Sequence, residues 1–189
     1  FQAAPEVYLK GQQDMFAYGI RALGKLAQNV HVCTSPDAVS RLNGFRKHIT
    51  HTYDGGYPAG DPGVLLYHTK RSPSENRSWF INGQDVLALA QFLKTGVYPV
   101  ERTMVVAGSS AKERLHIHTR LGVPLEHLAQ NKNGNDNARY VVGGILRGYS
   151  APKTSYMGFY ETSLALIPEG NEKEPFGFVR PGYNKPSYS

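Results

Sequence analysis

The sequence contains almost no cysteine and no long apolar run. Cys33 is the only cysteine among the 189 residues, so an intrachain disulfide and a four-thiolate zinc or iron–sulfur site are both excluded. The longest unbroken apolar run covers only residues 86–90, whereas a membrane-spanning helix needs roughly 18–20 apolar residues. We therefore expect a reducing, cytosolic setting and only peripheral contact with a membrane.

Blocks of like charge are also absent. The formal net charge is +6, but the basic residues are dispersed, whereas a nucleic-acid binder concentrates lysine and arginine on one face or in blocks. We therefore predict no nucleic-acid partner. Hydrophobic residues make up 40% and charged residues 19% of the chain, which is close to the globular average and sufficient for a buried core.

The length of the chain favours two small domains, because domains cluster at roughly 100–150 residues. The sequence begins with Phe1 rather than methionine, shows no signal segment and ends after a stretch rich in glycine and proline. We interpret it as a portion of a longer protein.

Residues 1–109 alternate between helical and extended patterns. Apolar residues spaced by three and four predict a helix over residues 12–28, and Ser35 and Asp61, each followed by proline, are typical helix starts. Another helix is predicted over residues 84–93, ending near Gly96. Extended segments are predicted at residues 30–33, 45–53, 79–81 and 102–107. Strands separated by helices favour a mostly parallel sheet, so we predict a Rossmann-like α/β domain.

The pattern changes in residues 110–189. Clusters of glycine, asparagine and proline separate short extended segments and one helix, which is typical of a small β-rich α+β domain. The predicted helix covers residues 124–129, and the predicted extended segments are residues 115–120, 140–146, 156–161, 164–167 and 176–179.

The phosphate-binding patterns of nucleotide sites are incomplete. A dinucleotide-binding loop requires two glycines one residue apart, and no Gly-x-Gly occurs in the chain. Gly55 and Gly60 have the spacing of a P-loop, but Asp61 and Pro62 follow where lysine and a hydroxyl residue would meet phosphate and magnesium. We therefore interpret the segment as a turn that Asp61 caps. A second interpretation is that residues 57–60, at a helix mouth, line a pocket for a neutral aromatic ligand such as a quinone.

No cluster of residues predicts catalysis or metal binding. His116 and His118 share one face of a predicted strand, but two ligands are too few, and Arg114 and Arg120 on the same face oppose a cation. Ser110 lies near them in sequence without the Gly-x-Ser-x-Gly turn of hydrolases. We therefore predict no catalytic residue, no metal ligand and no cofactor held by this chain.

Several stretches resemble the A subunit of the bacterial sodium-translocating NADH:quinone oxidoreductase, in the same order along the chain. They are Tyr-Asp-Gly-Gly-Tyr-Pro-Ala-Gly at residues 53–60, Ile-Asn-Gly-Gln-Asp-Val at 81–86, Phe-Leu-Lys-Thr-Gly at 92–96 and Pro-Phe-Gly-Phe-Val-Arg-Pro-Gly-Tyr-Asn-Lys at 175–185. The resemblance implies a Rossmann-like α/β domain, residues 1–109, followed by a small α+β domain of the soluble-ligand-binding β-grasp type, residues 110–189.

The resemblance also implies a function. The chain would be an accessory, cofactor-free part of a complex that transfers electrons from NADH to ubiquinone and exports sodium. Its partners would be the other subunits, which would carry NADH, flavins and iron–sulfur clusters at the cytoplasmic side of the bacterial inner membrane. Ubiquinone is the candidate ligand, and the candidate pocket lining comprises Tyr57, Pro58, Ala59, Gly60, Leu65 and His68.

The chain departs from the family's pattern at this pocket. The family often has histidine before Pro-Ala-Gly and further histidines just after it, where this chain has Tyr57, Leu65 and Tyr67. We therefore predict no quinone contact in this chain that depends on those histidines.

Two rival hypotheses remain open. The C subunit of the Rnf complex and the flavin-carrying subunit of respiratory complex I, both distant relatives of the family, bind NADH and flavin. The first rival is therefore a dehydrogenase module of that type, which a yellow full-length protein that oxidises NADH would establish. The second is a scaffold that binds only protein, which co-purification with partner subunits but no small molecule would favour.

Overall fold

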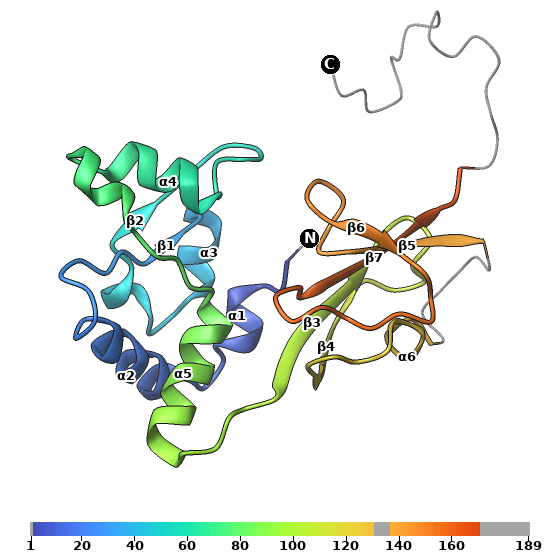
Figure 1. Cartoon of the computed structure of the whole chain (residues 1–189), viewed down its shortest axis with the longest axis horizontal. Helices are drawn as coiled ribbons and strands as arrows, with labels where there is room; N and C mark the ends of the chain where they lie inside the picture. The colour runs from blue at the N-terminus through green and yellow to red at the C-terminus, as the bar shows by residue number, and fades with distance from the viewer. Residues whose placement is uncertain (1, 131–136, 171–189) are drawn as a thin grey trace, which may run out of the picture.

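The chain folds into a helical half and a sheet half that lie side by side (Figure 1). The computed structural model describes residues 2–130 and 137–170. The helical half covers residues 2–95, the sheet half covers the described residues from 101 onward, and residues 96–100 form the connector between the halves. The described part of the chain is therefore a mixed α/β structure.

The helical half contains one pair of very short parallel strands among its helices. The strands are linked in sequence by a helix, as in a βαβ unit. In chain order the elements are α1 (Pro5–Tyr8), α2 (Gln13–Leu23), β1 (Cys33–Thr34), α3 (Pro36–Arg41), a 3-10 turn (Arg46–His48), β2 (His51–Thr52), α4 (Pro62–Thr69), a 3-10 turn (Pro73–Asn76) and α5 (Gly83–Thr95).

Local sequence signals determine where three of these helices begin or end. The Ser35 hydroxyl accepts a hydrogen bond from the Ala38 N–H at 3.3 Å and so caps α3. Asp61 caps α4, and Gly96 ends α5 with a φ of 72°, a left-handed conformation that glycine adopts without strain. The helix boundaries predicted at these positions are confirmed.

The core of the helical half forms where α2 packs against α5. Gly19 of α2 allows the close approach, because a Cβ at this position would lie 2.6 Å from Cγ1 of Val86. The rings of Phe16 and Phe45 meet edge to face with centroids 5.6 Å apart, a favoured aromatic geometry. The buried residues of this core are Leu9, Phe16, Ala38, Leu42, Phe45 and Val86.

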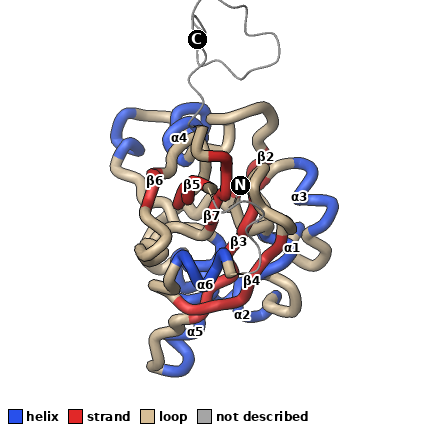
Figure 2. Tube along the Cα trace, turned by 90° about the vertical axis from the view of Figure 1, so that its right-hand side faces the viewer, coloured by secondary structure: helices blue, strands red, loops and turns tan. Residues whose placement is uncertain are grey.

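The sheet half is a five-stranded mixed sheet with one helix on it (Figure 2). The strand order is β4-β3-β7-β5-β6; β3 and β7 run parallel, and the other neighbouring pairs are antiparallel. The parallel pair joins the first and last strands at the centre of the sheet. The elements are β3 (Glu101–Ala107), β4 (Leu115–Arg120), α6 (Leu125–Ala129), β5 (Ala138–Val142), β6 (Tyr149–Ala151) and β7 (Ser163–Pro168).

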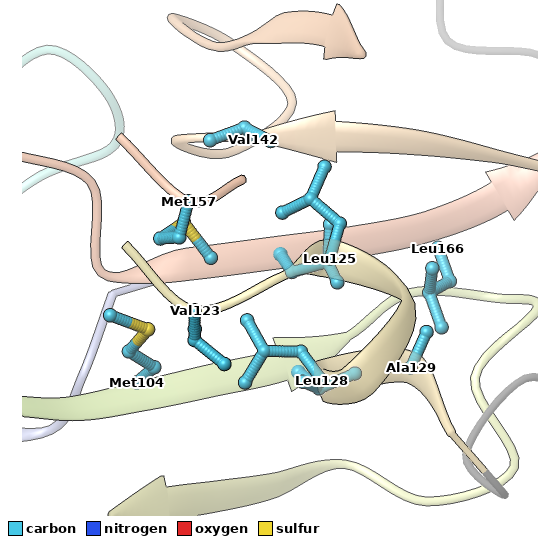
Figure 3. Close-up of a cluster of buried hydrophobic side chains, with 10 residues drawn as sticks. Met104, Val123, Leu125, Leu128, Ala129, Val142, Met157 and Leu166 are labelled. Atoms are coloured by element: carbon cyan, nitrogen blue, oxygen red, sulfur yellow. The ribbon is translucent and has the colours of Figure 1, made fainter. Parts of the chain in front are cut away.

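Helix α6 covers one face of this sheet and closes the larger core. Leu125 and Leu128 point from α6 toward the strands, where they meet Met104, Val142 and Leu166 (Figure 3). All five side chains are at most 1% exposed. Met104 and Val106 of β3, and Leu164 and Leu166 of β7, are two residues apart in this core, as expected when one face of a sheet is covered.

The N-terminal segment covers part of the opposite face and joins the halves. Ala3 packs with Val105 and Ala107 of β3. The Ala4 N–H donates a hydrogen bond to Nε2 of His116 on β4 at 3.0 Å. The helical half is therefore bound to the sheet through its first residues as well as through the connector.

Three of the strands predicted in the second half of the sequence are confirmed, at residues 102–107, 115–120 and 164–167, and so is the helix at 124–129. The segment predicted at 140–146 is a strand only as far as Val142, because a turn follows. Residues 156–161 form no strand, since Tyr156 makes only an isolated bridge with Pro124. The strand predicted at 176–179 lies outside the described residues.

Three expectations for the first domain are corrected. Residues 45–53 are not one extended segment, because Arg46–His48 form a 3-10 turn and only His51–Thr52 pair as a strand. Residues 79–81 are not a strand, and Trp79 is 99% exposed. Within the described residues, no neighbouring strand supplies the hydrogen bonds that extended backbone needs. Residues 102–107 do form a strand, but it pairs with β4 and β7 of the later sheet. A boundary after residue 109 would cut through that sheet, so the sheet half begins at β3.

Candidate functional site

The candidate pocket residues 57–60 form a tight turn before α4. The Tyr57–Pro58 peptide bond is cis. Gly60 packs against a ring, because a Cβ there would lie 2.8 Å from Cε2 of Tyr53. The Tyr57 side chain is 57% exposed, so its ring is available to a ligand or partner.

Arg147, from the turn between β5 and β6, reaches this segment from the sheet half. Its Nη1 lies 2.8 Å from Oδ2 of Asp61, and its guanidinium carbon lies 5.2 Å from the centre of the Tyr57 ring, within cation–π range. The sequence did not indicate Arg147 as a site residue, because nothing local connects positions 57 and 147. The only feature of the sequence that sets Arg147 apart is its place in the glycine-rich turn at residues 143–148.

Asp61 occupies the start of α4 with a negative charge. Its Oδ1 accepts a hydrogen bond from the Gly63 N–H at 2.8 Å, and its Oδ2 pairs with Arg147. The carboxylate therefore takes the backbone donor that a phosphate would use and repels an anion at the same point. The predicted Asp61-capped turn is confirmed, and this helix start does not suit a phosphate.

Leu65 and His68 lie farther along α4. Leu65 is half-buried, and the exposed ring of His68 stacks edge to face on Tyr67 with centroids 5.2 Å apart. Tyr67 is 69% exposed. None of the six predicted lining residues borders either of the two hollows described next, so the structure shows them as a surface segment beside Arg147.

The outer hollow lies in the sheet half, between α6 and strands β5 and β6, and measures about 760 Å³. Arg139 and Glu169 form an ion pair at its wall, with Nη2 and Oε1 2.8 Å apart. That pair lowers the pKa of the Glu169 carboxyl, mainly through the hydrogen bond from Arg139. Because Arg139 and Glu169 neutralise each other, this ion pair adds no net charge to the wall of the outer hollow.

The second hollow, which we call the inter-half hollow, measures about 440 Å³ and lies between the two halves. Its walls come from α2 and α5, from the connector, and from the start of β3 and the end of β4. Its lining residues are Tyr8, Gln12, Met15, Gln84, Leu87, Ala88, Gln91, Val97, Tyr98, Pro99, Val100, Glu101, Arg102, Thr103 and His118.

Two polar contacts join the helical half to the sheet half at the wall of the inter-half hollow. The Gln84 side chain bonds both backbone groups of Thr103, donating to its carbonyl and accepting from its N–H, each at 2.9 Å. Arg102, whose side chain is only 6% exposed, pairs with Asp85 at 3.1 Å. These contacts attach the first turn of α5 to β3.

Four of the histidines contact other residues of the protein. His116 accepts a hydrogen bond from the Ala4 N–H, and Nε2 of His118 lies 3.7 Å from Oε2 of Glu101. His31 and His51 bring their Nδ1 atoms within 3.3 Å of each other, a pairing that the sequence did not indicate. No group of three metal-ligating side chains occurs in residues 2–130 and 137–170.

The fold and the site define a mixed α/β protein whose candidate binding surfaces lie where a helical unit meets a small sheet. Comparison with known proteins refines this class. Residues 1–98 match the family described as the NqrA second alpha/beta domain. Nearly the whole chain is similar to proteins named as the A subunit of Na(+)-translocating NADH-quinone reductase.

Three such relatives illustrate the similarity. The chain is 31% identical over 185 residues to the protein of Histophilus somni strain 2336 and 32% identical over 186 residues to that of Haemophilus influenzae strain PittEE; each match covers 97% of this chain and 42% of the relative. It is 30% identical over 190 residues to the protein of Rhodopirellula baltica, with 99% of this chain and 42% of the relative covered.

The chain therefore belongs to the NqrA family, the A subunits of the Na+-translocating NADH-quinone reductase. It is thus homologous to one component of an enzyme complex, and it spans about 42% of the length of the relatives it matches. Within the described residues, no helix is both long enough and apolar enough to cross a bilayer.

Proposed function

We propose that the chain is an accessory, cofactor-free region of a sodium-pumping NADH:ubiquinone oxidoreductase, acting on the quinone side and in assembly of the complex. Its partners are the other subunits, which carry NADH, flavins and iron–sulfur clusters, at the cytoplasmic face of the bacterial inner membrane. Family membership carries the proposal. The absent Gly-x-Gly and the carboxylate at the start of α4 disfavour the rival nucleotide-binding module.

We also propose that the sheet half is a β-grasp domain and that the helical half is a Rossmann-like domain. A helix between the second and third strands, with the first and last strands parallel at the centre, supports a β-grasp arrangement in the sheet half. The parallel pair β1 and β2 around α3 supports a Rossmann-like origin of the helical half. We divide the two domains in the connector, since β3 belongs to the later sheet.

The quinone-facing surface that we propose consists of the Tyr57–Gly60 turn, Leu65, His68 and Arg147. An exposed phenol ring beside a guanidinium suits a flat ring with carbonyl oxygens, which stacks on the ring and accepts from the cation. Asp61 neutralises Arg147, so the surface favours an uncharged ligand over an anionic one. This agrees with a quinone head group rather than a nucleotide.

Titration of the isotope-labelled chain with a soluble short-tailed ubiquinone tests this surface. We expect saturable amide shift changes over residues 57–68 and around Arg147. Tyr57→Ala should weaken them several-fold, because the stacking surface is lost. The matched control is Tyr156→Ala, which removes another exposed tyrosine, 66% exposed, whose backbone bridges to Pro124 beside α6.

Two results would decide against the proposal. No saturable change at residues 57–68 would remove the quinone contact and favour the protein-only scaffold, which co-purification with the other subunits would then test. Yellow colour from a bound flavin, together with NADH oxidation by the full-length protein, would establish the dehydrogenase module instead.

A further inference from the structure

The segment between α4 and α5 exposes three consecutive apolar side chains. Trp79, Phe80 and Ile81 are 99%, 71% and 42% exposed, and they follow the second 3-10 turn of the helical half (Figure 1). Among the described residues, no hydrogen bond involves their backbone N–H or carbonyl groups. Large apolar side chains that gather on a surface mark a place where a partner or a membrane binds.

The turn before these side chains carries a net positive charge. Residues 62–82 contain the cations Lys70, Arg71 and Arg77 and a single carboxylate, Glu75. That carboxylate accepts a hydrogen bond from the Arg71 backbone N–H at 2.9 Å. Within the described residues, no ion pair includes any of the three cations. We call residues 70–82 the aromatic–basic loop.

Contacts within the aromatic–basic loop fix its shape. Nζ of Lys70 donates a hydrogen bond to Oδ1 of Asn76 at 3.0 Å and lies 5.6 Å from the centre of the Tyr67 ring, which is itself 69% exposed. The Ser78 hydroxyl donates to the Glu75 carbonyl at 2.5 Å. The loop is therefore ordered before it meets a partner, so less conformational entropy is lost on binding.

The exposed side chains favour a lipid surface over a protein partner. Three consecutive side chains cannot all point in one direction, and a protein surface would cover only one side of the loop. The interface of a bilayer is fluid and surrounds a loop that enters it. Tryptophan and tyrosine concentrate at that interface, and anionic headgroups attract nearby lysine and arginine.

The backbone limits how deeply the loop can enter. Hydrocarbon offers no partner to the unpaired N–H and carbonyl groups of residues 79–81, whereas water and phosphate at the headgroup level do. The loop is therefore suited to the headgroup region and not to the interior of the bilayer.

We propose that the aromatic–basic loop docks on an anionic phospholipid surface. Trp79 and Phe80 enter the headgroup region, and Arg71 and Arg77 pair with lipid phosphates. The inference rests on the proposed function for its occupant, the cytoplasmic surface of the inner membrane. The contact brings α4, which carries part of the proposed quinone-facing surface, close to the lipid.

Tryptophan fluorescence tests this docking directly, because Trp79 is the only tryptophan of the chain. The chain is titrated with vesicles of phosphatidylcholine alone and with vesicles that also contain phosphatidylglycerol. We expect the emission to shift to shorter wavelength with the anionic vesicles and much less with the zwitterionic ones. Raising the salt from about 0.1 M to about 1 M should weaken the binding, because the screening length falls from about 10 Å to about 3 Å.

Substitutions separate the apolar from the electrostatic contribution. Phe80→Ser should weaken binding to anionic vesicles at least about tenfold, since one large aromatic side chain is no longer buried. Arg77→Gln should weaken it about fivefold, as expected for one cation near a charged surface. The matched controls Phe159→Ser and Arg114→Gln change exposed residues of the sheet half and should leave binding unchanged. No shift with anionic vesicles, or equal effects of variants and controls, would overturn the inference.

The full-length subunit in its assembled complex tests whether lipid or protein occupies the loop. A photoreactive amino acid at position 80 should cross-link to phospholipid when the complex is in an anionic bilayer. Cross-linking to another subunit, or to another part of the same subunit, would show that the loop is a protein interface and would refute the inference.

The outcomes also separate this inference from the proposed function, because the quinone titration uses a soluble ubiquinone without vesicles. Quinone-induced shifts at residues 57–68 without vesicle binding would overturn the inference alone. Vesicle binding that Phe80→Ser and Arg77→Gln weaken, without any quinone-induced shift, would support the inference and remove the quinone contact at the turn.

Discussion

At the scale of single residues, Tyr8 packs against both halves of the chain, has a raised pKa and lines the inter-half hollow. Its ring packs against both the core of the helical half and the Ala3–β3 cluster. Its hydroxyl faces Gly83 at the first turn of α5. A side chain in this position transmits any change in its own ionisation to the contact between the two halves.

Tyr8 should make the stability of the chain fall at high pH. The pKa of Tyr8 in the folded chain, about 12, lies above the ordinary value of 10.0. The contribution of Tyr8 to the free energy of unfolding is therefore fully present below pH 10 and is lost as the pH rises toward 12. Tyr8→Phe removes this dependence. Urea unfolding below pH 10 and near pH 12 should therefore show the stability of wild type converging on, or falling below, that of the variant.

A constant difference between wild type and Tyr8→Phe across this pH window would contradict the prediction. Tyr160→Phe serves as the control, because Tyr160 is 78% exposed and its ionisation should hardly affect the free energy of unfolding. Absorbance of the tyrosinates should show one phenol fewer titrating at the alkaline end in Tyr8→Phe.

At the scale of elements, the contact between α2 and α5 depends on a missing side chain. Ala at position 19 would place its Cβ 2.6 Å from Val86 Cγ1 and 2.8 Å from the Val86 carbonyl oxygen. The helices cannot keep their separation and also accommodate that methyl group. We expect Gly19→Ala to lower the free energy of unfolding by about 1–3 kcal/mol, as overpacking does.

Gly24→Ala is the matched control for this helix contact. Gly24 follows the same helix with a φ of −63°, and a Cβ there would meet its nearest atom at an ordinary 3.5 Å. Alanine should be neutral or stabilise by about 0.4–1 kcal/mol, because it restricts the unfolded chain. Equal destabilisation by both substitutions in chemical denaturation would show that packing against Val86 is not the cause.

At the scale of the whole molecule, a few polar contacts align the two halves. Pairing of β3 with β7 begins at Val105, so the β7-facing backbone of Thr103 lies beyond the ladder and bonds Gln84 instead. Arg102 pairs with Asp85, and Arg147 pairs with Asp61. The sheet half is therefore positioned by side chains of the helical half and not by the connector alone.

Gln84→Ala should weaken this alignment. The Thr103 N–H and carbonyl would lose their partners in a partly buried place, so we expect the free energy of unfolding to fall by about 1–3 kcal/mol. Gln91→Ala changes an exposed glutamine of the same helix that makes no such contact, and should change stability by less than about 0.5 kcal/mol. Similar thermal unfolding of the two variants would contradict the role of Gln84.

Hydrogen exchange of the Thr103 amide gives an independent measure of the same contact. In wild type this N–H donates to the Gln84 side-chain oxygen at 2.9 Å, so it should exchange slowly. Gln84→Ala should accelerate its exchange, whereas Gln91→Ala should not. Unchanged protection at Thr103 in Gln84→Ala would show that another group satisfies the amide.

The sequence by itself determined the features that depend on near neighbours. Ser35 and Asp61 as caps and Gly96 as a helix end follow from hydroxyl, carboxylate and glycine chemistry. The strand at 115–120 follows from alternating side chains, and the strand at 164–167 follows from a short continuous apolar run. The ordered motifs likewise sufficed to indicate the family to which the chain belongs.

Only the tertiary structure decided which segments lie together. Residues 79–81 and 102–107 both have the composition of strands. In the part of the chain that the structure describes, the first segment has no pairing partner, whereas the second pairs with β7, far along the chain. The contact between Arg147 and Tyr57, and the hollow that Tyr8 and Arg102 both line, likewise join positions distant in sequence. Pairing and burial depend on what the rest of the chain places alongside, and local spacing carries no information about that.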